Sequence, residues 1–164
     1  MFVLGIDPGL TRTGYGVVEV LAGTERAVAA GVIRTDPSIP VAYRLVELQT
    51  DILSVLDEHP VDAAAIEQVF VNRNRNTAMA VARASGVLMA AIADRGVDVS
   101  EYSPSQMKMA ITGNGSAGKD QVEAVVAMRL GLGSVSGPAD VADALGVALC
   151  HTQHASSPAR RDAS

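Results

Sequence analysis

The sequence is poor in several residue types, and their scarcity narrows what the protein can be. Its 164 residues include one cysteine, Cys150, and no tryptophan. A single cysteine excludes an internal disulfide framework and is typical of a reducing compartment. The sequence shows no N-terminal signal segment, and no apolar run near the roughly 20 residues that span a membrane. These absences together predict a cytoplasmic protein that does not act at a membrane.

The residues that are present predict a folded domain. Apolar residues make up 48% of the chain and charged residues 19%, a balance typical of globular proteins. We expect one domain over residues 1–154 and a disordered tail over 155–164. A net charge of −5 argues against a nucleic-acid partner only if the charges are evenly spread. They are not, because the two lysines, Lys108 and Lys119, both precede the last predicted helix.

Apolar segments predict three strands at the start of the chain. Residues 2–6 form an apolar run, and residues 14–20 and 27–34 are rich in valine and alanine. Residues 21–24 (LAGT) carry a hairpin signal between the second and third segments. Because the links are short, the three strands are expected to be antiparallel.

The hydrophobic period then changes. Apolar residues step by three and four from Val41 to Val55, which predicts a core-facing helix, and residues 62–66 form a short strand. A right-handed crossover makes that strand parallel to its neighbour. The remaining predicted elements are a helix over 76–95 with small residues on nearly every side, a strand over 97–102, a short helix from Ser103, a loop over 113–116, and helices over 119–130 and 138–151.

Four acidic residues stand out against this background. Asp7 and Glu67 each follow an apolar strand, and Asp140 and Asp143 lie three residues apart on a predicted helix. Each has an ordinary explanation by itself, as a turn residue, a strand end or a complement to the helix dipole. Asp143 is the hardest to explain this way, because a second acid beside Asp140 adds repulsion unless something positive lies between them.

The combination of the four acids predicts a metal site. Asp7 and Glu67 end strands that we expect to be adjacent and parallel, and sites in α/β sheets form outside such carboxyl ends. A helix packed beside that edge can bring Asp140 and Asp143 to the same place. Carboxylate oxygens suit Mg²⁺ or Mn²⁺ better than zinc. Two such ions would be able to clamp a scissile phosphate.

Two other patterns are weaker. Residues 113–120 (GNGSAGKD) nearly match a P-loop, but Asp120 stands where the loop needs a hydroxyl, and a helix is predicted before it instead of a strand. This loop can still hold one phosphate of a nucleic-acid backbone. Cys150, His151 and His154 are too few for a zinc site, so we interpret them as a buried thiol and solvent-facing imidazoles.

Four segments of the sequence resemble the signature blocks of the RuvC family, the bacterial Holliday junction resolvases. They are GIDPGL (5–10), IEQVF (66–70), GNGSA (113–117) and PADVADAL (138–145), and they occur in the family's order. The resemblance extends from Met1 to about His151. Each block is modest alone, and the four together are highly specific.

The resemblance implies a fold and an activity. The fold is α/β and RNase H-like, a five-stranded mixed sheet with the first three strands antiparallel, flanked by helices. The activity is the symmetric cleavage of four-way junction DNA by a homodimer, which leaves 5′-phosphate and 3′-hydroxyl ends. The implied cofactor is Mg²⁺, two ions per subunit, with Mn²⁺ as a substitute. A functional link to the RuvAB branch-migration complex is also implied.

The resemblance further implies roles for single residues. The four acids match the family's metal ligands, and Lys108 and Lys119 match lysines near the scissile phosphate. Phe70 matches an aromatic that stacks on or wedges between bases at the crossover, with a place in the core as the alternative. The predicted helix over 76–95 matches the dimer interface. The other expected DNA contacts are Arg73, Asn74, Arg75 and Ser116.

Two alternative functions share this fold. A catalytically silent nucleic-acid-binding module is disfavoured, because a mere binder gains nothing from four acids beside a phosphate. An RNase H-like nuclease that acts on RNA is disfavoured less strongly, by the Phe70 loop and the last block.

Overall fold

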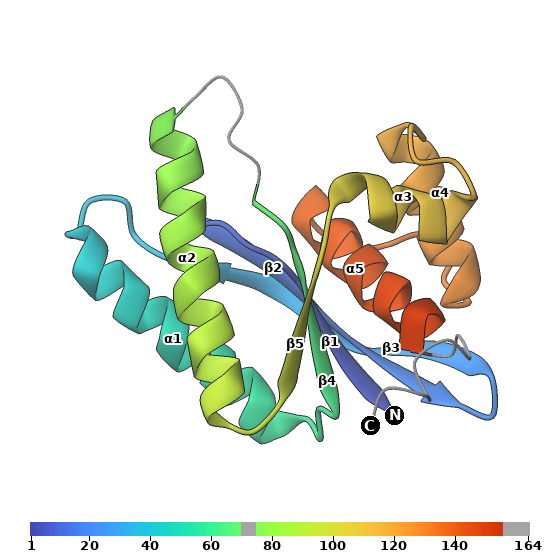
Figure 1. Cartoon of the computed structure of the whole chain (residues 1–164), viewed down its shortest axis with the longest axis horizontal. Coiled ribbons are helices and arrows are strands. Elements are labelled where there is room, and N and C mark those ends of the chain that lie inside the picture. Colours follow the sequence, from blue (N-terminus) through green and yellow to red (C-terminus); the bar gives the residue numbers. More distant parts are fainter. Residues whose placement is uncertain (70–74, 156–164) are drawn as a thin grey trace, which may run out of the picture.

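The computed structural model describes residues 1–69 and 75–155, which form a five-stranded sheet between two layers of helices (Figure 1). The strands are β1 (Phe2–Asp7), β2 (Arg12–Leu21), β3 (Thr24–Arg34), β4 (Ala63–Glu67) and β5 (Asp98–Tyr102). Their order is β3-β2-β1-β4-β5. The pairs β1–β2 and β2–β3 are antiparallel, whereas β1–β4 and β4–β5 are parallel. The mixed sheet predicted from the sequence is therefore confirmed.

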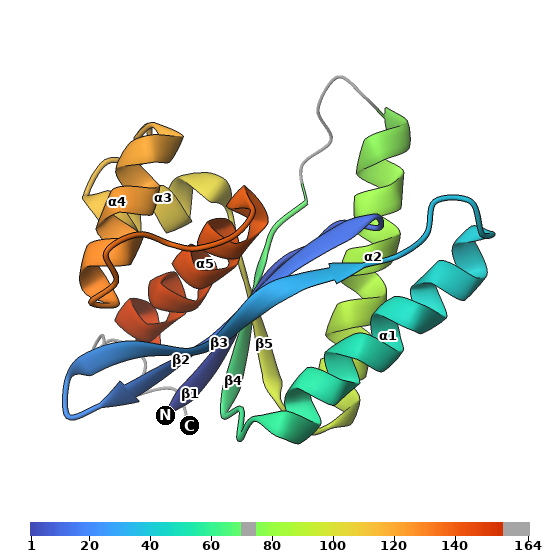
Figure 2. The ribbon, with the colours of Figure 1, turned by 180° about the vertical axis from the view of Figure 1, so that it is seen from behind.

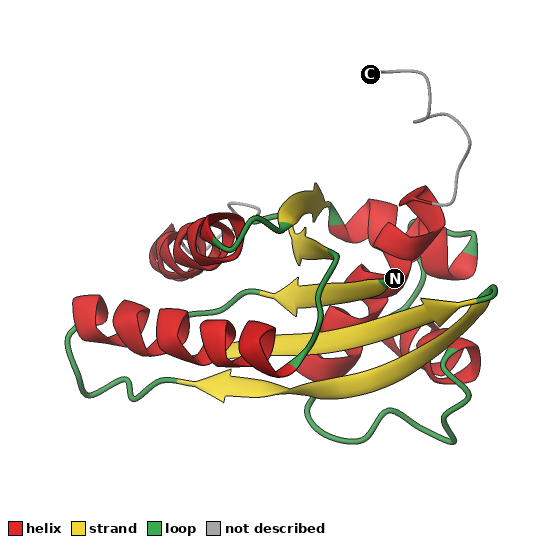
Figure 3. Ribbon diagram, turned by 90° about the horizontal axis from the view of Figure 1, so that it is seen from below, coloured by secondary structure: helices red, strands yellow, loops and turns green. Residues whose placement is uncertain are grey.

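Helices cover both faces of this sheet. One face carries α1 (Val41–Glu58) and α2 (Arg75–Asp94), and the other carries α3 (Pro104–Thr112), α4 (Lys119–Arg129) and α5 (Ala139–Ala155) (Figure 2). The sheet is twisted, so that β4 and β5 are rotated relative to β2 and β3 (Figure 3). Each face has its own apolar cluster, because both are covered.

Successive side chains of the central strands point to opposite faces of the sheet, and so pack against different helix layers. Val3 of β1 packs in the cluster under α3, α4 and α5, whereas Leu4 and Ile6 pack in the cluster under α1 and α2. In β4, Ala65 belongs to the first cluster and Ile66 to the second. Because side chains alternate with period two, Asp7 and Glu67 at the two strand ends share the α5 side with Val3 and Ala65.

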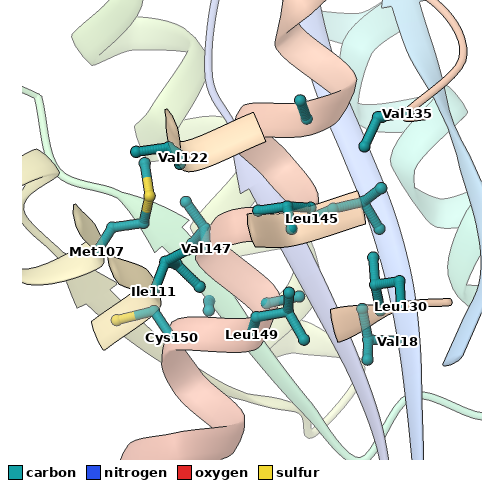
Figure 4. Packing of buried hydrophobic residues seen from close by; sticks show 14 of the residues in the cluster. Val18, Met107, Ile111, Val122, Leu130, Val135, Leu145, Val147, Leu149 and Cys150 are labelled. Atoms are coloured by element: carbon teal, nitrogen blue, oxygen red, sulfur yellow. The ribbon is translucent and has the colours of Figure 1, made fainter. Parts of the chain in front are cut away.

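Helix α5 is the central element of its layer. Leu145 and Leu149 are almost completely buried, as is Val18 of β2 beneath them (Figure 4). Met107 of α3 and Val122 of α4 cover the other side of the helix (Figure 4). Helices α3 and α4 therefore hold α5 against the sheet.

Three glycines let α5 lie close against the sheet, two of them in contact with its backbone. A Cβ atom at Gly5 would lie 2.0 Å from the carbonyl oxygen of Ala144, and one at Gly14 would lie 2.0 Å from that of Asp140. A Cβ atom at Gly16 would meet the Leu145 side chain at 2.6 Å. We call Gly5, Gly14 and Gly16 the glycine face. Any residue with a Cβ atom at these positions would collide with the helix, so only glycine allows this close packing.

All predicted elements are present, and four of them extend beyond their predicted ends. Strand β3 begins at Thr24 instead of residue 27, and α1 continues past Val55 to Glu58. Strand β2 begins at Arg12 instead of residue 14, because the ladder with β3 continues past the apolar run to the pair Arg12–Arg34. Helix α5 continues past His151 to Ala155, since Thr152 is buried and its hydroxyl donates to Glu25 at 2.7 Å. The predicted hairpin is present, with Ala22 at φ +51° and Gly23 at +82°.

Helix α2 is buried on one side only. Leu88 and Ile92 are fully buried, whereas Met79 is 54% exposed. Over Asn76–Asp94 it is nevertheless long and apolar enough to cross a membrane by length and composition, so the expectation that no such stretch exists is wrong. The helix packs against α1 and β5, as the core helix of a globular domain does.

The glycine face yields a test of the fold. We expect Gly5→Ala to lower the free energy of unfolding by about 3 kcal/mol or more, because its Cβ would collide with the α5 backbone. Gly133→Ala is the matched control, since nothing lies within 4 Å of a Cβ there, and we expect a change within about 0.5 kcal/mol. Urea denaturation measures both. Equal stability of the two variants would contradict the close contact.

Candidate active site

Two carboxylates stand at the carboxyl ends of adjacent parallel strands. Asp7 ends β1 and Glu67 ends β4, and the register pairs Ile6 with Ile66 just before them. In the antiparallel ladder Asp7 lies directly opposite Gly14 of β2. Both acids therefore lie at the carboxyl ends of neighbouring parallel strands, as the sequence predicted.

The first turn of α5 completes the group. Because Gly14 has no side chain, the backbone of Asp140 rests on β2 at the position opposite Asp7. Asp143 follows one turn later on the same helix. Asp140, Asp143 and Glu67 all act on the charge of Asp7, which shows that the four acids form one electrostatic group. We call Asp7, Glu67, Asp140 and Asp143 the carboxylate cluster.

The cluster raises the pKa of its two strand members. Burial is the largest cause at Asp7, followed by the negative charges of Glu67, Asp143 and Asp140, and together they raise its pKa to about 7. Burial and then Asp143 raise the pKa of Glu67. A buried group of like charges at the strand ends lowers the stability of the fold unless cations neutralise it. Its chemistry therefore favours the binding of positive charge.

Two lysines supply part of that positive charge. The Nζ atom of Lys119, the first residue of α4, donates to the Asp143 carboxylate at 2.8 Å. This hydrogen bond raises the pKa of Lys119, and the charges of Asp143, Asp7 and Asp140 add to the effect. Lys108 of α3 lowers the pKa of Glu67 through its charge. Both predicted lysines thus lie beside the cluster.

A third cation was missed by the sequence analysis. The guanidinium of Arg12, the first residue of β2, forms a hydrogen-bonded ion pair with the Asp140 carboxylate. One sequence signal is present: residues 12, 14 and 16 share a strand face, and two of them are glycines. Because α5 packs on Gly14 and Gly16, the Arg12 side chain on the same face lies next to the start of that helix.

The donor set fits a hard divalent cation, but the described conformation does not gather it around one point. Four carboxylates offer the oxygen ligands that Mg²⁺ and Mn²⁺ prefer. Among residues 1–69 and 75–155, no three His, Cys, Asp or Glu side chains are arranged to hold one ion. The α5 acids are instead paired with Arg12 and Lys119.

The other predicted DNA contacts are only partly described. Phe70, Arg73 and Asn74 lie outside the described residues, and Arg75 begins α2 with a side chain that is likewise not described. Ser116 is exposed in the loop between α3 and α4, where its N–H donates to Asn114 Oδ1 at 3.0 Å. The loop follows helix α3, so it lacks the strand that a P-loop requires.

The C-terminal imidazoles differ from their interpretation. Cys150 is fully buried, as expected, but both histidines are partly buried. The hydroxyl of Tyr102 lies 3.0 Å from Nδ1 of His151, and the Tyr102 and His154 rings lie 5.1 Å apart. Tyr102 ends the edge strand β5, so these imidazoles pack on the sheet edge instead of facing solvent.

Comparison with known proteins gives consistent matches along almost the whole chain. The sequence model of the family described as crossover junction endodeoxyribonuclease RuvC matches residues 3–151. The protein of that name from Pelotomaculum thermopropionicum is 44% identical over 154 residues, which cover 94% of each chain.

Solved structures agree. The structure of Thermus thermophilus RuvC has a TM-score of 0.88 at 37% identity, and covers 94% of this chain and 95% of its own. The T. thermophilus RuvC in complex with Holliday junction substrate has a TM-score of 0.89 at 38% identity, with 94% of each chain covered.

The raised pKa of Asp7 predicts a pH-dependent stability in EDTA. Its folded-state pKa of about 7 exceeds the ordinary 3.8, so the destabilisation is fully present above pH 7 and fades as pH falls toward 4. Asp7→Asn removes the charge. We expect it to raise the free energy of unfolding at pH 8 by up to about 4 kcal/mol, and by less than about half as much at pH 5.

Urea denaturation at the two pH values measures this difference. The control is Asp98→Asn, because Asp98 is an exposed acid at the start of β5, at the opposite end of the sheet. A stabilisation of Asp7→Asn that is the same at both pH values would contradict the electrostatic origin.

Proposed function

The chain belongs to the RuvC family of crossover junction endodeoxyribonucleases, and on this premise we propose that it hydrolyses phosphodiester bonds at the carboxylate cluster. Its fold is the RNase H-like α/β fold, and its function is the resolution of Holliday junctions. Cleavage leaves 5′-phosphate and 3′-hydroxyl ends. The observation that carries the site is the convergence of Asp7, Glu67, Asp140 and Asp143, from two strand ends and one helix, in a single electrostatic group.

The cluster would hold the metal ions on which the family depends. Mg²⁺ is the proposed cofactor, two ions per subunit with Mn²⁺ as a substitute, and bound ions supply the charge that activates water and neutralises the phosphate. The protein's own part is to present four carboxylates. Asp7 and Glu67 are fixed on strands, whereas Asp140 and Asp143 can turn from their cations toward the site.

The lysines act on the phosphate. The ammonium group of Lys119 lies beside the cluster and is held there by Asp143, so it can stabilise negative charge that develops on the phosphate as the bond breaks. Lys108 stands near Glu67 and adds a second positive charge. A cleft with only acids would repel DNA, so these cations are needed for the substrate to approach.

Junction recognition is assigned to a dimer. We place the dimer interface on α2, in line with the family resemblance, so that two active sites meet two strands of a twofold junction. The segment with Phe70, Arg73, Asn74 and Arg75 follows the active-site strand β4 and would contact DNA, as would Ser116. A functional link to the RuvAB complex is proposed on the same basis.

The alternatives are less well supported. A silent binding module does not account for four acids that share one electrostatic site. An RNA-directed nuclease is not favoured, because the family match runs over residues 3–151 and its named members are crossover junction endodeoxyribonucleases.

Cleavage of a synthetic four-way junction tests the activity. We expect cleavage in Mg²⁺, none in EDTA, and much slower cleavage of a linear duplex of the same sequence. Asp7→Asn should reduce the cleavage rate by about 10²-fold or more and leave junction binding intact, because it removes a ligand and not a DNA contact. Asp98→Asn, remote from the site, should cleave like the wild type. Equal cleavage of junction and duplex would contradict the proposal.

Phe70 offers a separate test of recognition. If its ring stacks on bases at the crossover, Phe70→Ala should lower the junction cleavage rate by about tenfold, as expected when a stacking contact is lost, with little change in melting temperature. Thermal denaturation and single-turnover cleavage measure the two effects. A loss of several degrees in melting temperature with an unchanged rate would show that Phe70 is a core residue.

A further inference from the structure

The position of Arg12 follows from the glycine face. Residues 12, 14 and 16 of β2 share one side of the strand, and the first turn of α5 rests on Gly14. The next side chain on that side belongs to Arg12, so it is placed against the start of α5. Its guanidinium pairs there with the carboxylate of Asp140. The contact is thus imposed by strand register and helix packing.

The loop between Asp7 and Arg12 is held at both ends. The buried hydroxyl of Thr13 donates to the carbonyl of Gly9 at 2.6 Å and accepts the Gly9 N–H at 3.2 Å. Behind the loop, the guanidinium of the buried Arg44 donates to the Thr11 hydroxyl at 2.7 Å. These hydrogen bonds hold the chain on both sides of Arg12, and so fix the position of its backbone relative to Asp7.

The ion pairs explain why the carboxylates do not converge. Asp140 is bonded to Arg12 and Asp143 to Lys119, and no three potential ligands among the described residues surround one point. A carboxylate that neutralises a guanidinium has fewer lone pairs free for an ion. Lys119 already has a part in the proposed reaction, whereas Arg12 has none.

We propose that Arg12 is an internal counterion of Asp140 that competes with the divalent cation for this carboxylate. The inference rests on the proposed function, in which Asp140 is a metal ligand. Without metal, Arg12 neutralises Asp140 and holds its carboxylate in the ion pair. When an ion binds, Asp140 leaves the guanidinium, which remains at the rim of the site. The pair can be displaced, because its side chains are 42% and 28% exposed.

The competition predicts that the protein binds metal more tightly without Arg12. We expect Arg12→Ala to lower the dissociation constant for Mn²⁺ about two- to fivefold in the absence of DNA, as the loss of a partly exposed ion pair implies. Titration with Mn²⁺, followed by EPR of the free ion, measures this directly. The readout does not depend on cleavage.

A matched control separates this effect from net charge. Arg26→Ala also removes one positive charge and breaks an ion pair, with Glu19 at 2.7 Å, at the far end of β2 where Glu19 pairs with Phe2. We expect Mn²⁺ affinity to stay at the wild-type value. If both variants tighten binding equally, general electrostatics explains the effect and the inference fails.

A double-mutant cycle tests whether Arg12 acts through Asp140. In an Asp140→Asn background, Arg12→Ala should no longer tighten Mn²⁺ binding, because the carboxylate for which the two cations compete is gone. Unchanged or weaker binding of Arg12→Ala in the wild-type background overturns the inference, as does equal tightening in both backgrounds. Failure of the proposed function looks different: the wild type and Asp7→Asn would then bind Mn²⁺ equally.

Discussion

The contact between the backbone of α5 and the glycine face is the constraint on which the site depends. Gly5 and Gly14 let the helix carbonyls of Ala144 and Asp140 lie where side chains would otherwise stand. A helix that packed on ordinary side chains would have to lie further from the sheet, because a Cβ atom at Gly5 or Gly14 would stand 2.0 Å from its carbonyl oxygens. Asp140 and Asp143 would then not reach the strand ends. The glycines in β1 and β2 therefore determine how close the α5 carboxylates lie to Asp7 and Glu67.

The same closeness creates a charge problem. Four carboxylates meet at one edge of the sheet, and burial with mutual repulsion raises the pKa of Asp7 to about 7. Two features reduce this repulsion. The raised pKa values favour the protonated forms of the strand acids, and the helix acids form ion pairs with Arg12 and Lys119. Divalent cations can replace both the protons and the internal cations. Stability and metal binding are thus opposed at this site, as is common where function requires strained electrostatics.

The fold and the four acids could be predicted, because their signals are local or additive. Valine-rich segments and the period of three and four from Val41 mark the elements. Asp7 and Glu67 each follow an apolar run, and Asp140 and Asp143 are spaced for one face of a helix. The prediction missed Arg12, because its role depends on which helix covers the glycine face, a long-range fact. It also misjudged His154, whose ring packs on Tyr102 at the end of β5, since a helix terminus reads as solvent-exposed in sequence. Phe70 stays a prediction, outside the described residues.

The central claim is that the carboxylate cluster is the metal site at which DNA is cut, and anomalous diffraction from a crystal soaked in Mn²⁺ tests it most directly. The account predicts peaks within coordination distance of Asp7 and Glu67, with the carboxylates of Asp140 and Asp143 turned from their cations toward the ions. An anomalous map with peaks only elsewhere, or with no peak between β1, β4 and α5, would contradict it.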